Sequence, residues 1–219
     1  MKFALRVIRP RSVLYDWDGT LIRFRSEAFL HSINAALNNF DLPGLNSLSE
    51  SKNIRDTLAK TGNLVLALEI FRHNFTEYPI SRTDLIPDAL EILEHTHSLG
   101  LKQGVVSNLD HKLLVPEIRR LGLDKYFAIV IGSKNQEQLK PKPDLLFTAM
   151  QAVNLQPRTT FYLGDNNNDM LAARAAGCIS VYIGMDPIKE KPDIVLPRIK
   201  EFQHILSPQP TRSVSYEII

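Results

Sequence analysis

The sequence lacks the features that mark secreted and membrane proteins. It contains one cysteine, Cys178, so these 219 residues cannot form an internal disulfide. No run approaches the ~20 apolar residues of a membrane span. The basic opening, MKFALRVIRPR, is interrupted by charge too early to hold the apolar region of a signal peptide. We therefore expect a cytoplasmic protein with no membrane partner and with a buried, unreactive Cys178.

An excess of charge of either sign is also lacking. The 26 Lys and Arg residues stand against 24 Asp and Glu residues, which leaves a net charge of +2. A chain with this balance has no broad positive surface for a nucleic acid backbone, so we expect no nucleic acid partner. With 44% hydrophobic residues and only 10 glycines, the composition is that of a globular protein. Its length allows one full core and a small second unit.

Short apolar runs recur along the chain and predict a parallel sheet. The first is SVLYDW, at residues 12–17, and it ends where Gly19 breaks the pattern. Four similar runs follow, at residues 101–108, 126–133, 159–165 and 178–184. An amphipathic helical pattern precedes each of these four runs. This alternation predicts an α/β fold with a doubly wound, Rossmann-like parallel sheet of about five strands.

A long interval between the first two runs predicts an insertion. More than eighty residues separate residues 12–17 from residues 101–108, which is far more than one crossover helix needs. Apolar residues recur at helical spacing within residues 29–40 and 64–75, and a more polar helix is expected within 47–60. We expect a core at residues 1–21 and 85–206, a helical cap at 22–84, and a flexible tail at 207–219.

Polar residues gather where the predicted strands end. In open parallel sheets, ligands bind beyond the carboxyl ends of the strands, so these residues are candidates for a site. An aspartate pair ends the first run, a Ser-Asn pair ends the second, and two more aspartates follow the fourth. A lysine lies in the loop beyond the third. The set comprises Asp16, Asp18, Ser107, Asn108, Lys140, Asp165 and Asp169.

These residue types together indicate phosphoryl transfer. Converging carboxylates repel one another unless a cation lies among them, and a set of oxygen ligands without a Cys or His cluster favours Mg²⁺. Lys140, Ser107, Asn108 and the backbone N–H groups near Gly19 and Thr20 are donors suited to phosphoryl oxygens. Pro141 follows Lys140 directly and stiffens the loop that presents the ammonium group.

Four motifs, DWDGT, VVSN, KPKP and GDNNND, occur in this order and resemble those of the haloacid dehalogenase-like hydrolase superfamily. The resemblance covers about residues 12–206. The insertion is similar to the helical cap of the phosphoglycolate phosphatase and β-phosphoglucomutase branch. This resemblance implies a phosphatase that uses Mg²⁺ to hydrolyse a small phosphorylated metabolite.

The resemblance also implies roles for individual residues. Asp16 would attack phosphorus and form an aspartyl-phosphate, and Asp18 would protonate the leaving oxygen and then take a proton from water. Mg²⁺ would be held by Asp16, the backbone carbonyl of Asp18, and Asp165. Asp169 would lie at or just beyond these ligands and orient Lys140. Ser107 would donate to the phosphoryl oxygens.

Other interpretations of the sequence stay open. A phosphosugar mutase of the β-phosphoglucomutase type needs the same four motifs, and a phospho-accepting or silent regulatory protein uses a related sheet. Within the superfamily that the chain resembles, the acidic residue at position 18 implies that a dehalogenase is disfavoured, because that branch lacks an acidic residue there. After DGTLI the chain has Arg23, Phe24 and Arg25, where many relatives have an acidic and a small polar residue. We hypothesise that Arg23 or Arg25 contacts a second anionic group of the substrate; two solvated arginines are the alternative. The sequence indicates neither the particular phosphomonoester nor the oligomeric state.

Overall fold

The computed structural model describes residues 10–78, 80 and 84–206. The chain forms two compact units, one made of Met1–Arg23 with Arg82–Ile219 and the other of Phe24–Ser81. The basic opening and the tail expected at 207–219 lie outside the described residues. Within the described residues, no helix combines the length and the apolar character needed to cross a lipid bilayer.

The larger unit is built on a six-stranded sheet in which every pairing is parallel. The spatial order is β3-β2-β1-β4-β5-β6, so the chain winds outward in both directions from β1. This order confirms the predicted doubly wound fold. The strands are β1 (Ser12–Tyr15), β2 (Lys102–Asp110), β3 (Ile129–Ser133), β4 (Thr160–Gly164), β5 (Ile179–Ile183) and β6 (Ile194–Leu196).

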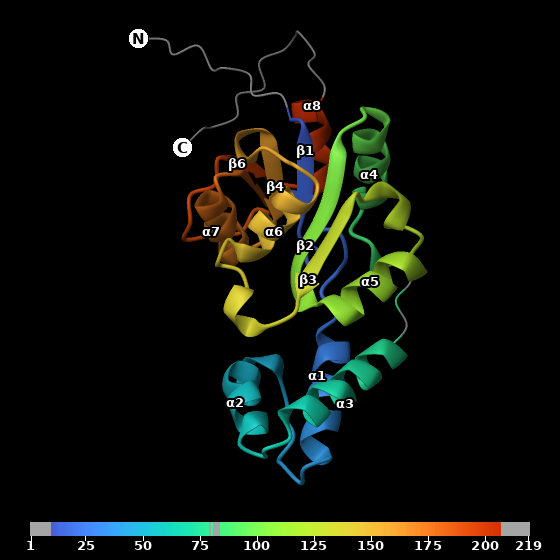
Figure 1. The fold of residues 1–219 in the computed structure, drawn as a ribbon, viewed down its shortest axis with the longest axis vertical. Coiled ribbons are helices and arrows are strands. Elements are labelled where there is room, and N and C mark those ends of the chain that lie inside the picture. Colours follow the sequence, from blue (N-terminus) through green and yellow to red (C-terminus); the bar gives the residue numbers. More distant parts are fainter. Residues whose placement is uncertain (1–9, 79, 81–83, 207–219) are drawn as a thin grey trace. The chain divides into compact units, whose positions relative to one another are not determined.

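Helices cover both faces of this sheet. Figure 1 shows α4 (Ala89–Ser98) and α5 (His111–Arg120) on one side of the strands, with α6 (Asp144–Ala152) and α7 (Asn167–Ala176) on the other. The core under α6 and α7 joins Leu14, Val106 and Tyr162, one residue from each of three neighbouring strands. Val13, Val105 and Phe161, which alternate with these residues along the same strands, are buried on the other face. Burial on both faces explains why the strands read as nearly continuous apolar runs. Short helical turns complete the unit, at Asp124–Tyr126, Gln136–Gln138, Pro157–Thr159, Ile199–Phe202 and α8 (Gln203–Leu206).

Two strands differ from the sequence-based expectation. The sheet has six strands instead of about five, because β6 adds an edge strand of three residues. Its central residue, Val195, is 45% exposed, and so short a strand has no apolar run that could predict it. The third strand begins at Ile129 instead of at residue 126, because Asp124–Tyr126 forms a 3₁₀ turn that buries the Tyr126 ring.

The smaller unit is helical. It contains α1 (Ser26–Asn38), a 3₁₀ helix (Leu48–Asn53), α2 (Ile54–Ala59) and α3 (Leu64–Glu77). A small core of its own joins α1, α2 and α3 through Ile33, Ala36, Leu37, Leu58 and Ala67. Asn34 closes the loop after α1, because its side chain donates to the Leu45 carbonyl and accepts from the Leu45 N–H.

The boundary of the smaller unit lies inside the expected range of 22–84. Ile22 forms an antiparallel bridge with Leu85, and the Arg23 N–H donates to the Asp84 carbonyl over 2.8 Å. These bonds attach Ile22 and Arg23 to the larger unit, and the smaller unit begins at Phe24.

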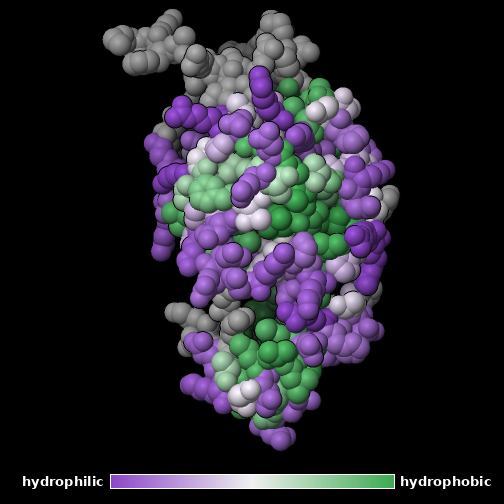
Figure 2. All heavy atoms as spheres, in the orientation of Figure 1, coloured by the Kyte–Doolittle hydropathy of each residue, from purple (hydrophilic) through white to green (hydrophobic). Residues whose placement is uncertain are grey.

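Figure 2 shows apolar side chains reaching the surface near β3, whose residues Ile129–Ile131 are only partly buried, as an edge strand allows.

Candidate active site

A tight turn follows β1 and carries the two aspartates of the first motif. The Asp16 N–H donates to the Leu163 carbonyl over 2.8 Å, which continues the pairing of β1 with β4 by one residue. The Trp17 carbonyl then accepts the N–H groups of Leu21 and Ile22, each over 3.0 Å. This turn reverses the chain immediately after the sheet. Asp16 is thereby held at the carboxyl edge of the central strands.

Gly19 is required by the shape of this turn. Its φ of +87° is left-handed, and a Cβ atom built on it would lie 2.1 Å from Asp165 Oδ2. The backbone at Gly19 therefore lies directly against the carboxylate that follows β4. Only glycine allows both the backbone conformation and this close approach.

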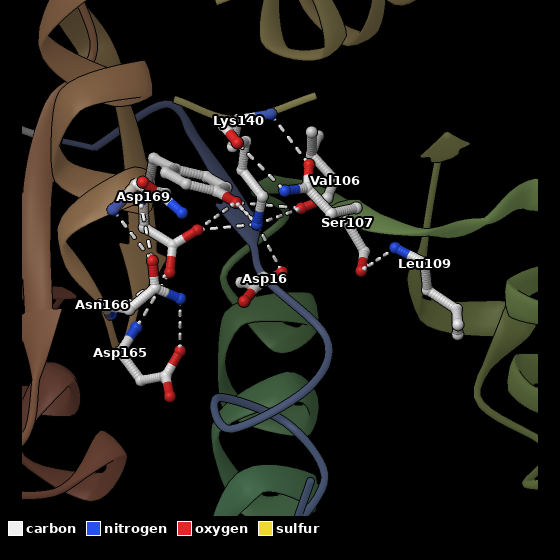
Figure 3. Close-up of polar contacts among 11 residues, drawn as sticks. Asp16, Val106, Ser107, Leu109, Lys140, Asp165, Asn166 and Asp169 are labelled. Carbon is white, nitrogen blue, oxygen red and sulfur yellow. Dashed lines mark hydrogen bonds and ion pairs between the residues drawn. The ribbon is translucent and has the colours of Figure 1, made fainter. Parts of the chain in front are cut away.

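Lys140 extends into the same edge from the loop after β3. Its Nζ lies 2.6 Å from Asp16 Oδ1 and 2.6 Å from Asp169 Oδ1, and the lysine is only 5% exposed. Figure 3 shows the ammonium group between these two carboxylates. Asn108 fixes the backbone behind it, because its Oδ1 accepts from the Lys140 N–H and its Nδ2 donates to the Lys140 carbonyl. Lys140 is therefore held at both ends of its side chain.

The fourth motif holds Asp169 rigidly. Asp169 Oδ2 accepts from the N–H groups of Asp165 and Asn166, over 3.2 Å and 3.3 Å. The Asn166 side chain in turn accepts from the Asp169 N–H, so the two residues form a capping box at the start of α7. One oxygen of Asp169 thus stabilises the loop while the other bonds Lys140. A Cβ atom at Gly164 would lie 2.3 Å from Asp169 Cβ, which explains the glycine that ends β4.

The site concentrates negative charge. Asp16, Asp165 and Asp169 can each place one carboxylate oxygen within 4.8 Å of the others. Burial, with the neighbouring charge of Asp169, raises the pKa of Asp16 well above its usual range, although Lys140 opposes the shift. Burial and Asp169 also raise the pKa of Asp165. With three carboxylates and one ammonium group, the cluster retains two negative charges when all four are ionised.

Lys140 stays charged in this environment. Burial by itself would lower the pKa of Lys140, but the carboxylates of Asp16 and Asp169 outweigh burial, so the pKa is raised. The ammonium group therefore supplies a permanent positive charge beside Asp16. It also makes the close approach of Asp16 and Asp169 tolerable in the protein interior.

The other predicted phosphate contacts are arranged differently. Ser107 lies at the same strand edge, is 2% exposed, and accepts the Leu109 N–H on its Oγ, which leaves its own proton to donate. The Gly19 N–H donates to the Ile22 carbonyl over 2.7 Å, and the Thr20 N–H lies 3.4 Å from the Trp17 carbonyl. Both N–H groups thus already have acceptors within the turn. The Asn108 amide is likewise engaged with the Lys140 backbone.

The remaining predicted residues are not members of the three-carboxylate cluster. The Asp18 side chain is partly buried and is not one of the three clustered carboxylates, but its charge contributes to raising the pKa of Asp16. Arg23 is exposed on the larger unit. Arg25 belongs to the smaller unit, where its guanidinium carbon lies 4.5 Å from the centre of the Phe75 ring.

Two polar contacts near the site involve residues that sequence reasoning passed over. The Tyr162 hydroxyl lies 2.8 Å from Lys140 Nζ, and the Trp17 indole N–H donates to Glu117 Oε2 over 3.0 Å. The sequence pattern around Tyr162 and around Glu117 could have indicated these contacts. Tyr162 places a polar tip in an otherwise apolar strand, and Glu117 falls on the buried face of α5 beside Leu113 and Leu114. An isolated polar group in a buried pattern requires a partner.

The fold and the cluster together define an α/β enzyme with an acidic centre at the carboxyl ends of its strands. The chain belongs to the haloacid dehalogenase-like hydrolases, because the model of that family matches residues 13–183. This match confirms the predicted superfamily. Asp16 and Asp165, which follow β1 and β4, lie inside the matched segment.

Relatives and solved structures agree with this assignment. The phosphoglycolate phosphatase of Salmonella typhimurium is 28% identical over 202 residues, which covers 78% of this chain and 80% of that protein. A predicted phosphoglycolate phosphatase from Haemophilus somnus is 24% identical, with a TM-score of 0.72 over 93% of this chain and all of that one. The β-phosphoglucomutase of Clostridium difficile has the same fold, with a TM-score of 0.73 at 17% identity over 90% of this chain and 97% of that one. The predicted branch and the expectation of a phosphatase enzyme are thus confirmed.

Proposed function

We propose that the protein is a Mg²⁺-dependent phosphatase that hydrolyses a small phosphate monoester through an aspartyl-phosphate on Asp16. The observation that carries this proposal is the buried Lys140 ammonium, 2.6 Å from both Asp16 and Asp169, at the edge of the three-carboxylate cluster. A nucleophilic carboxylate, a permanent cation and an acidic metal site are the parts that phosphoryl transfer needs.

The donor set fits Mg²⁺. The clustered ligands are all carboxylate oxygens, which this hard ion prefers, and the two excess negative charges of the cluster match a divalent cation. Asp16 and Asp165, with the backbone carbonyl of Asp18, would hold the ion, and Asp169 would stay with Lys140. When bound, Mg²⁺ supplies charge neutralisation for the carboxylates and for the phosphoryl oxygens.

The two aspartates of the first motif would divide the chemistry. A carboxylate oxygen of Asp16 attacks phosphorus, the bond from phosphorus to the leaving oxygen breaks, and Asp18 gives that oxygen its proton. Asp18 then takes a proton from a water molecule as this water attacks phosphorus. The bond between phosphorus and Asp16 breaks, inorganic phosphate leaves, and both carboxyl groups return to their starting states.

The donors around Asp16 would stabilise the transferred group. The charge of Lys140 offsets the negative charge that accumulates when a phosphate approaches Asp16. The Ser107 Oγ accepts the Leu109 N–H, so the hydroxyl proton of Ser107 would be donated to a phosphoryl oxygen. We keep Arg23 and Arg25 as candidate contacts for a second anionic group of the substrate. The substrate is a small phosphorylated metabolite such as phosphoglycolate or a sugar phosphate, which the phosphoglycolate phosphatase relatives support.

A screen of phosphate monoesters with and without Mg²⁺ tests this proposal. We expect inorganic phosphate to be released from phosphoglycolate or a related small ester, and we expect a chelator to abolish the release reversibly. Phosphate release distinguishes hydrolysis from a mutase reaction, which would yield an isomeric sugar phosphate instead. Activity that persists undiminished after chelation would contradict the metal requirement. Isomerisation without phosphate release would reassign the protein as a mutase.

The Gly19→Ala variant is expected to weaken Mg²⁺ binding by at least about tenfold, as supporting residues of metal sites commonly do. The new methyl group would overlap Asp165 Oδ2, which lies 2.1 Å from its position, so the carboxylate must move away. Isothermal titration of the metal-free protein with Mg²⁺ measures the affinity.

Gly100→Ala is the matched control for this variant. Gly100 has a similar φ of +70°, but a Cβ atom there meets nothing within 4 Å. Both variants therefore share the backbone strain of a left-handed alanine, and only Gly19→Ala displaces Asp165. If both variants bound Mg²⁺ as tightly as the natural chain, Asp165 would not be a ligand.

A further inference from the structure

Tyr162 lies beneath the site on β4, and none of the proposed catalytic steps uses it. Its side chain is fully buried, and its hydroxyl oxygen lies 2.8 Å from Lys140 Nζ, 2.9 Å from the Val106 carbonyl oxygen and 3.2 Å from Asp169 Oδ1. The hydroxyl thus connects the lysine to β2, the strand that carries Ser107. A buried phenol in such a place is unusual, because each of its polar contacts must be satisfied within the protein.

The protons of Lys140 and Tyr162 can be assigned to the shortest of these contacts. An ammonium group has three N–H donors, and three acceptors lie within 2.8 Å of Nζ: Asp16 Oδ1, Asp169 Oδ1 and the Tyr162 hydroxyl. The single proton of Tyr162 is then free to be donated to the Val106 carbonyl at 2.9 Å, and Asp169 Oδ1, at 3.2 Å, is its more distant alternative acceptor. Burial and the neighbouring carboxylates raise the pKa of Tyr162, so the hydroxyl keeps this proton.

Without the Tyr162 hydroxyl, the third N–H of Lys140 has no close acceptor among the described residues. The nearest alternative is the Val106 carbonyl, which lies 3.4 Å from Nζ, beyond the usual range for such a bond. The ammonium group would then rotate, or shift toward Val106, and lengthen its bonds to Asp16 and Asp169. The Tyr162 hydroxyl is a neutral acceptor, so it fixes the third N–H of Lys140 and leaves the charged bonds to Asp16 and Asp169 undisturbed.

We infer that Tyr162 is a positioning residue that fixes the orientation of the Lys140 ammonium group between Asp16 and Asp169. It acts through Lys140 and does not contact the substrate. The effect on turnover rests on the proposed phosphatase function, whereas the effect on the lysine does not. The inference therefore has one kinetic readout and one readout that is independent of activity.

The kinetic test compares Tyr162→Phe with Tyr15→Phe. Tyr15 is also fully buried and lies on the neighbouring strand β1, but its hydroxyl bonds Thr96 and Gln103 instead of Lys140. Each variant loses one buried hydroxyl, so both are expected to lose similar stability. We expect Tyr162→Phe to lower kcat about tenfold with KM changed less than about twofold, and Tyr15→Phe to leave both within about twofold.

The second test observes the Lys140 ammonium directly in metal-free protein labelled with ¹⁵N-lysine. A buried ammonium with three acceptors exchanges its protons slowly, so we expect a resolved signal that is missing from the Lys140→Arg variant. Tyr162→Phe should accelerate this exchange by at least about tenfold, because one of the three bonds is lost. Tyr15→Phe should leave the signal unchanged.

The outcomes separate this inference from the proposed function. If the natural chain releases no phosphate from any ester but the lysine signal responds to Tyr162→Phe, the function is wrong and the positioning contact stands. If the chain is an active phosphatase but Tyr162→Phe changes neither kcat nor the exchange rate, the inference is wrong. Equal losses of kcat in Tyr162→Phe and Tyr15→Phe, or no lysine signal in the natural chain, would also overturn it.

Discussion

Replacing Asp16 by asparagine is expected to reduce phosphate ester hydrolysis by at least about 10⁴-fold, a loss comparable to that seen when a nucleophile is removed from other enzymes. The carboxamide has nearly the same shape, but its oxygen is a poor nucleophile, and it cannot form the aspartyl-phosphate. Initial rates of phosphate release, at saturating Mg²⁺ and substrate, measure the effect.

The fold should survive this substitution. Burial and Asp169 raise the pKa of Asp16, which shows that a carboxylate here is costly, and a neutral amide avoids part of this cost. Lys140 keeps its bond to Asp169. A thermal melting curve close to that of the natural chain would therefore assign the lost activity to chemistry. Asp124→Asn, at an exposed position in a 3₁₀ turn, is the control for the same exchange away from the site.

Replacing Lys140 by methionine is expected to have the second largest effect. Activity should fall by about 10²- to 10³-fold, the range for removal of a preorganised group that stabilises developing charge. The free energy of unfolding without metal should also fall, by about 3–5 kcal/mol, because Asp16 and Asp169 are left as buried carboxylates without their shared ammonium. Phosphate release and chemical denaturation measure the two effects.

Two controls distinguish loss of the Lys140 charge from a general loss of structure: the response of the variant to Mg²⁺ and the same substitution at a neighbouring lysine. Because Mg²⁺ offsets the same carboxylates, it should raise the melting temperature of Lys140→Met more than that of the natural chain. Lys142→Met is the matched control, since Lys142 lies in the same KPKP motif but is exposed. Equal losses in both variants, or a Lys140→Met variant with nearly full activity, would refute the role given to Lys140.

The clustering of the acidic residues could be predicted from the sequence because it depends on topology. In a parallel sheet centred on β1, the residues that follow β1 and β4 must lie side by side, since Tyr15 pairs with Leu163. Asp16 follows Tyr15 directly, and Asp165 follows Gly164, the last residue of β4. The order of the four motifs added Lys140 and Asp169, and the structure places both beside Asp16.

The hydrogen-bond partners could not be predicted in this way. The phosphate contact of Asn108 stays a prediction, whereas the bonds of its amide to the N–H and the carbonyl of Lys140 depend on how the loop after β3 folds back. The contact of Tyr162 with Lys140 depends on side-chain direction across two strands. The edge strand β6 was missed because three residues are too few to show a period. Such features depend on the packed structure instead of on local pattern.

The position of the arginines shows why substrate choice is harder to predict. Arg23 is attached to the larger unit through its backbone bond to Asp84, whereas Arg25 packs on Phe75 in the smaller one. Two residues that are nearly adjacent in the sequence thus belong to different units. Their proposed contact with a second anionic group depends on the substrate itself, which the motifs of the catalytic core do not specify.

The most direct test of the central claim is to look for the phosphoryl group on Asp16 during turnover. The protein is mixed with Mg²⁺ and the best ester from the screen, quenched in acid within one turnover, and digested for mass spectrometry. The account predicts that the peptide containing Asp16 gains one phosphoryl group, and that Asp16→Asn shows neither this adduct nor turnover. Turnover without an adduct on that peptide, or with the adduct on another residue, would contradict it.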